Sequence, residues 1–117
     1  MLRAIVIATL LGSVGTLPSP ATAMSGNDLY RYCIGEPAEP VAQIGCIAFI
    51  GGFIEGLGIG QEMQRTGKPI CAPEGLNAGQ ARLMIEKRMR EHPEFLHFKA
   101  NEIAGAALLA AFPCPKR

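Results

Sequence analysis

Residues 46–60 read CIAFIGGFIEGLGIG, and this stretch decides the fold. Its large aliphatic residues recur at three- and four-residue steps, at Ile47, Ile50, Ile54 and Leu57. That spacing places them on one face of a helix. Proline suits the first turn of a helix and glycine its end. Because Pro40 precedes the stretch and Gly67 follows it, we predict a single long helix over about residues 41–65.

The same helix carries a second face made of small residues. Ala48, Gly52, Gly56 and Gly60 are four residues apart and therefore share one side. A smooth face of this kind lets another helix approach closely. The segment is also long enough to span a membrane, but Gln43 and Glu55 interrupt it and glycine stands where leucine would be expected. We therefore predict a tightly packed core helix, with no stable membrane insertion of the mature chain.

Three further helices are expected around this one. A short helix over 27–33 ends at Gly35-Glu36-Pro37, and the last helix covers about 100–112. The third begins after Asn77, which forms a capping-box pattern with Gln80 and is followed by the buried stripe Ala78, Ala81, Ile85 and Met89. No alternating stretch is long enough for a sheet. The sequence thus predicts an all-α domain of four helices.

The four cysteines predict two disulfides. Cys33 ends the first helix and Cys46 lies early in the second, whereas Cys71 precedes the third helix and Cys114 follows the fourth. Antiparallel packing would bring each pair together, giving two disulfide-tied helical hairpins. Loop closure by these bridges is worth about 3 and about 4 kcal/mol, less any strain. Zinc is the alternative, but the spacings of 13, 25 and 43 residues lack the close ligand pairs of zinc modules.

The first 23 residues have the three parts of a secretory signal. A positive start at Arg3 precedes an apolar run over 4–11, and Ala21-Thr22-Ala23 has the small-residue form of a cleavage site. We predict cleavage after Ala23, which leaves a domain of residues 24–117 in the periplasm. An uncleaved membrane anchor is the alternative, although the apolar run is much shorter than the roughly 20 residues of a spanning helix.

Composition excludes several functions. The chain has 117 residues, enough for one small domain, and 11 Lys and Arg face 10 Asp and Glu. Removal of Arg3 would balance these charges, and a neutral chain without a basic cluster is a poor ligand for nucleic acid. The mature part has one serine and one aspartate, Ser25 and Asp28, beside an N-terminus that we expect to fray. We therefore predict no catalytic residue, no metal and no cofactor, and expect a binding protein rather than an enzyme.

Several motifs resemble a known family. They are the stretch from Cys46 to Leu57, Ile70-Cys71-Ala72-Pro73-Glu74-Gly75, Gln80, His92-Pro93-Glu94 and Ala111-Phe112-Pro113-Cys114-Pro115. Together they are similar to Tai-type immunity proteins, the periplasmic antidotes to peptidoglycan amidases that type VI secretion systems deliver. The resemblance covers most of residues 26–115.

The resemblance implies an all-helical inhibitor, often a homodimer, that obstructs the substrate cleft of an amidase effector. The apolar last helix fits a dimer surface, or equally a helix buried within one chain. Candidates for the partner-binding surface are the exposed cations, at Arg65, Lys68, Arg82, Lys87 and Arg90. Two other functions stay open: an acid-stress chaperone of the HdeA type, and an envelope binding module without a toxin partner.

Overall fold

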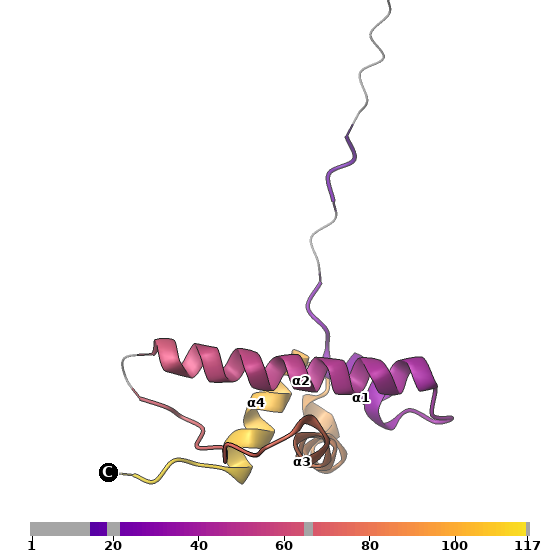
Figure 1. Ribbon diagram of the computed structural model, residues 1–117. Helices are drawn as coiled ribbons and strands as arrows, with labels where there is room; N and C mark the ends of the chain where they lie inside the picture. Colours follow the sequence, from indigo (N-terminus) through magenta and orange to yellow (C-terminus); the bar gives the residue numbers. More distant parts are fainter. Residues whose placement is uncertain (1–14, 19–21, 65–66, 117) are drawn as a thin grey trace, which may run out of the picture.

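The computed structural model describes residues 15–18, 22–64 and 67–116, and these form a bundle of four helices (Figure 1). Their order is α1 (Gly26–Ile34), α2 (Pro40–Met63), α3 (Ala78–Glu91) and α4 (Ala100–Ala111), with a short 3-10 helix (Pro93–Phe95) before α4. Within the described residues the only extended pairings are two isolated bridges, Ser25 with Lys99 and Ile70 with Pro113. The predicted all-α class is confirmed.

Both predicted disulfides are present. Cys33–Cys46 joins the end of α1 to α2, and Cys71–Cys114 joins the segment before α3 to the segment after α4, so each bridge closes one hairpin. A backbone hydrogen bond from the Cys71 amide to the Phe112 carbonyl (2.9 Å) reinforces the second bridge. The expected architecture of two disulfide-tied helical hairpins is therefore confirmed.

The helix ends follow from local chemistry. At α3 the Asn77 side chain accepts from the Gln80 amide (2.9 Å) and the Gln80 side chain accepts from the Asn77 amide (3.2 Å), which is the predicted capping box. Pro40 occupies the first position of α2, where its missing N–H costs nothing. These local signals explain why the predicted boundaries lie within a few residues of the observed ones.

The core lies where α1, the first half of α2, α3 and α4 meet. Its largest fully buried side chains come from all four helices and are Leu29, Cys46, Ile50, Ile85, Met89 and Leu108. The predicted α3 stripe is buried at three of its four positions, and Ala78 is half-buried. α4 contributes Ala100, Ile103, Ala104, Ala107 and Leu108, so it is buried within one chain rather than held out as a dimer surface.

The start of the domain is firmly attached, which corrects the expectation of a frayed N-terminus. Ser25 caps α1, and the Gly26 amide donates to the Phe98 carbonyl (2.8 Å). The Ala100 amide donates in turn to the Met24 carbonyl (2.8 Å). Most of the predicted signal peptide, residues 1–14 and 19–21, lies outside the described residues; residues 15–18, 22 and 23 are exposed and have no regular structure.

Candidate functional site

The groups that could support catalysis are engaged with one another in separate pairs. All four cysteines are in disulfides, which leaves no thiol to act as a nucleophile. The Ser25 hydroxyl donates to Asp28 (2.7 Å), while His92 lies 3.1 Å from Glu94, so serine, aspartate and histidine are not assembled into a triad. Among the described residues, no three His, Cys, Asp or Glu side chains gather as a metal site would require.

These contacts lower the pKa of two carboxyl groups. The pKa of Asp28 lies below its ordinary value because the Ser25 hydroxyl, and then Arg31, donate hydrogen bonds to its charged form. The pKa of Glu94 is also lowered, chiefly by its own backbone amide and then by His92. Hydrogen bonds that favour the charged form suit capping and pairing rather than proton transfer.

The small-residue face of α2 is exposed, so the prediction of a tightly packed core helix is wrong for a single chain. Ala48, Gly52, Gly56 and Gly60 are all exposed. A Cβ built at any of the three glycines would meet no other atom within 4 Å. Among the described residues, no other helix lies against this face. The face is therefore open to a partner.

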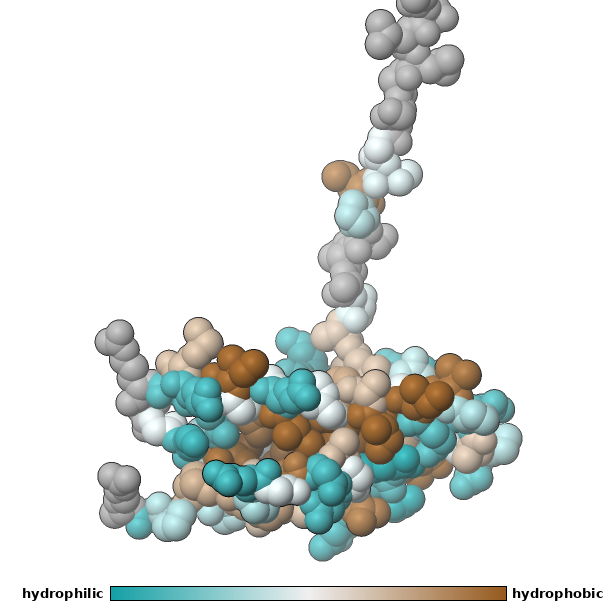
Figure 2. Space-filling view, in the orientation of Figure 1, coloured by the Kyte–Doolittle hydropathy of each residue, from teal (hydrophilic) through white to brown (hydrophobic). Residues whose placement is uncertain are grey.

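Large apolar side chains extend this exposed face along the whole helix. They are Val41 (81% exposed), Ile44 (69%), Ile59 (61%) and Met63 (79%). Figure 2 shows brown hydrophobic residues along the course of α2, with pale and teal residues between them. Of the helices in the described residues, α2 is the one long and apolar enough to cross a membrane by length and composition, and 11% of its apolar window is buried. We call the exposed residues Val41, Ile44, Ala48, Gly52, Gly56, Ile59, Gly60 and Met63 the outer face of α2.

The predicted basic candidates divide into two groups. Lys68 is exposed in the loop after α2, and the side chains of Lys87 and Arg90 on α3 are 72% and 56% exposed. Arg82 is different, because its side chain is 22% exposed and points into the molecule. Arg65 lies outside the described residues.

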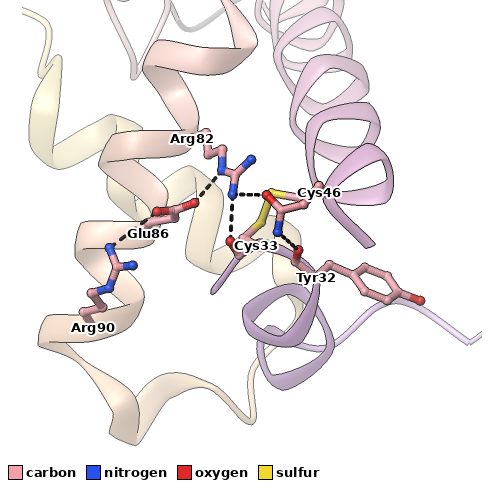
Figure 3. A network of polar contacts seen from close by, with 7 residues as sticks. Tyr32, Cys33, Cys46, Arg82, Glu86 and Arg90 are labelled. Atoms are coloured by element: carbon pink, nitrogen blue, oxygen red, sulfur yellow. Dashed lines mark hydrogen bonds and ion pairs between the residues drawn. A yellow bond between two sulfur atoms is a disulfide. The ribbon is translucent and has the colours of Figure 1, made fainter. Parts of the chain in front are cut away.

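Arg82 joins three helices through a polar network (Figure 3). Its guanidinium pairs with Glu86 on α3, donates to the Cys33 carbonyl at the end of α1 (2.7 Å) and donates to the Gln43 side chain on α2 (2.6 Å). Gln43 in turn donates to the Tyr32 carbonyl (3.1 Å). Glu86 is the buried member of this network, at 8% exposed. The network lies beside the Cys33–Cys46 bridge and ties α2 to α1 and α3, so Arg82 is a structural residue.

A second surface was not anticipated from the sequence. Between the end of α3, the 3-10 turn and α4 lies a hollow of about 170 Å³, with lining residues Arg88, His92, Phe95, Phe98, Glu102, Ile103 and Ala106. Both histidines and two of the five phenylalanines of the chain fall within residues 92–98. This clustering of rings in a short turn is the sequence feature that could have indicated the hollow.

The fold and these surfaces define a class: a small, disulfide-linked helical protein whose exposed apolar features suit the binding of another protein. A family model described as Rap1a immunity proteins matches residues 25–114, which is most of the chain. The chain therefore belongs to the Rap1a immunity protein family. The resemblance of its motifs to immunity proteins is confirmed, and the Tai type stays a prediction. No similar curated protein and no similar solved structure was found.

Proposed function

We propose that this chain is a periplasmic immunity protein of the Tai type, which binds a peptidoglycan amidase delivered by type VI secretion and blocks it. The observation that carries the proposal is the match to an immunity family over residues 25–114. Two disulfides support an oxidising compartment such as the periplasm. Peptidoglycan and the enzymes that cut it lie in that compartment, so the inhibitor would meet its target there.

Inhibition of this kind requires a surface rather than a reacting group. A specific interface buries about 800 Å² on each partner and depends on a few anchoring side chains. The paired cysteines, and a His92 that contacts Glu94 rather than the Ser25–Asp28 pair, support a non-catalytic role. Protection would follow from occupation of the substrate cleft of the amidase, without any chemical step on this chain.

We also propose that the outer face of α2 holds a second copy of the chain. α2 is about 36 Å long, and an antiparallel pair could place glycines at the crossing where the helices approach most closely. A membrane is a poorer partner for this face. The Arg82 network and the Cys33–Cys46 bridge hold the first half of α2 on the domain, so insertion would drag a buried charge pair toward the bilayer.

Co-expression tests the immunity function. The full chain, with its natural export segment, is produced together with periplasm-directed peptidoglycan amidases drawn from type VI effector families, and lysis is scored. Protection against one amidase, with loss of its activity on addition of the purified chain, supports the proposal. Absence of protection across the whole panel contradicts it. Suppression of client aggregation at low pH by the same protein would instead favour an acid-stress chaperone.

Light scattering after size exclusion tests the dimer. The wild-type protein should have twice the mass of one chain, and Ile59→Asp should have the mass of one. Leu83→Asp is the matched control, because Leu83 is similarly exposed (68% against 61%) but lies on α3. A monomeric wild type, or equal behaviour of the two variants, would show that α2 is not the dimer contact.

A further inference from the structure

The hollow beside α3 has the size of a socket for a single side chain. Sites for drug-sized ligands and cofactors have volumes of about 300–1,000 Å³, whereas this hollow measures about 170 Å³. Ile103 and Ala106 of α4 give it an apolar wall. An isolated metabolite would be poorly enclosed there, but one aromatic or branched apolar side chain from a partner protein would fit.

The aromatic wall of the socket is exposed and preformed. Phe95 and Phe98 stack with ring centroids 5.6 Å apart, and His92 stacks on Phe95 at 5.7 Å. Phe95 is 36% exposed and Phe98 is 44% exposed. Backbone hydrogen bonds fix the turn that carries them, from Phe98 to the Phe95 carbonyl (2.9 Å) and from Gly26 to the Phe98 carbonyl (2.8 Å). Rings held in place before binding lose little entropy when a partner arrives.

The charges around the socket leave one cation without a partner. The Arg88 guanidinium lies 5.9 Å from the centre of the Phe95 ring and makes no ion pair within the described part of the chain. The nearby carboxylates already have partners, since Glu94 contacts His92 (3.1 Å) and Glu102 accepts from the Lys99 amide (3.1 Å). A partner that supplied a carboxylate next to its apolar anchor would pair with Arg88 in a partly desolvated place.

We propose that this socket, formed by Arg88, Phe95, Phe98, Ile103 and Ala106, anchors the effector. It receives an aromatic or branched apolar side chain of the effector, and Arg88 pairs with a carboxylate adjacent to that side chain. This inference rests on the proposed immunity function and adds to it the place and chemistry of the main contact. The socket lies on the α3–α4 side of the domain, so it involves residues other than those of the outer face of α2.

The test uses the amidase against which the wild-type chain protects. Its affinity is measured by calorimetry for the full, oxidised chain and for two variants, Phe98→Ala and Arg88→Gln. Each variant should weaken binding by about tenfold or more, as expected for a buried anchor. Loss of Arg88 should also reduce the dependence of the affinity on salt concentration.

Two matched variants serve as controls. Leu109→Ala removes an apolar side chain from α4 that is about as exposed as Phe98 (46% against 44%) and does not line the socket. Lys116→Gln removes a positive charge from an exposed residue near the C-terminal end of the described chain, outside the socket. Both should change the affinity by less than about threefold, because exposed rim residues contribute little. Thermal unfolding of every variant verifies that the domain is folded.

Each outcome decides a different point. If the wild-type chain binds the amidase and both socket variants bind within about threefold of it, the socket is wrong while the immunity function stands. If the variants dissociate the dimer but keep their affinity for the amidase, the socket holds a second copy and the inference is wrong. If the wild-type chain protects against no amidase, the proposed function fails and the socket assignment fails with it.

Discussion

Replacement of Arg82 by methionine should destabilise the domain far more than its position on a charged helix suggests. The side chain joins α3 to α1 and α2 through Glu86, the Cys33 carbonyl and Gln43. Arg82→Met keeps the aliphatic volume but removes every one of these contacts. The Glu86 side chain, 10% exposed, would retain only Arg90 at 3.4 Å.

The expected loss follows from that geometry. Hydrogen bonds to charged groups contribute about 1.5–3 kcal/mol each, and breaking a buried ion pair costs about 3–5 kcal/mol. Because Arg90 and water compensate in part, we expect a loss of about 3 kcal/mol in the free energy of unfolding. For a domain of this size that corresponds to a fall in Tm of about 12–24 °C.

Urea unfolding of the oxidised protein, followed by far-UV circular dichroism, measures the change. Arg90→Met is the matched control: it removes the same kind of pair with Glu86 from a side chain that is 56% exposed, and should cost less than about 1 kcal/mol. The double variant Arg82→Met with Glu86→Met should be more stable than Arg82→Met alone, since no carboxylate is left unpaired. Equal losses for Arg82→Met and Arg90→Met would refute the reasoning.

Three further predictions concern glycines, a disulfide and an acidic residue. Gly26→Ala should lower the Tm of the protein, because its Cβ would lie 2.7 Å from the Leu96 carbonyl oxygen. Gly58→Ala, which lies outside the outer face of α2 and has nothing within 4 Å, should leave the Tm unchanged or raise it, and the reverse order would contradict the packing described. Replacing Cys71 and Cys114 by serine should cost up to about 4 kcal/mol in urea unfolding, and an unchanged midpoint would show that the bridge does not constrain the unfolded chain. NMR titration should give Asp28 a pKa below 3.8, and this pKa should rise in Ser25→Ala. A lowered pKa stabilises the fold at pH values above the unfolded-state pKa, and this stabilisation is lost as the pH falls through the folded-state pKa. An unchanged Asp28 pKa in Ser25→Ala would exclude the Ser25 hydroxyl as the cause of the lowered pKa.

Local signals made the helices and the disulfides predictable. The Asn77 capping box and Pro40 act within a few residues, so they can be read directly from the chain. The cysteine pairing followed once the helices were placed in hairpins. The position of Arg82 could not be predicted in this way. Its partners Gln43 and Cys33 are 39 and 49 residues away, and only the packing of three helices brings them together.

The error at α2 has a different cause. Periodicity shows that Gly52 and Gly56 share a face, but it does not show whether the helix that covers the face belongs to the same chain. In the described part of the chain, α1, α3 and α4 pack on the other side of α2 or on each other, so none of them covers this face. The socket was missed for a related reason. Phe95 and Phe98 look like core residues in the sequence, and their exposure depends on how the turn is held by Gly26.

The two proposed interaction surfaces are held by different constraints, and this bears on how the protein would act. The outer face of α2 is fixed by the Cys33–Cys46 bridge and the Arg82 network. The socket is fixed by the hydrogen bonds between the start of α1 and the 92–98 turn. An inhibitor that works by shape gains affinity from rigid surfaces, because little entropy is lost on binding. Separate supports allow one surface to hold a second copy while the other meets the effector, so a change at either surface should leave binding at the other intact.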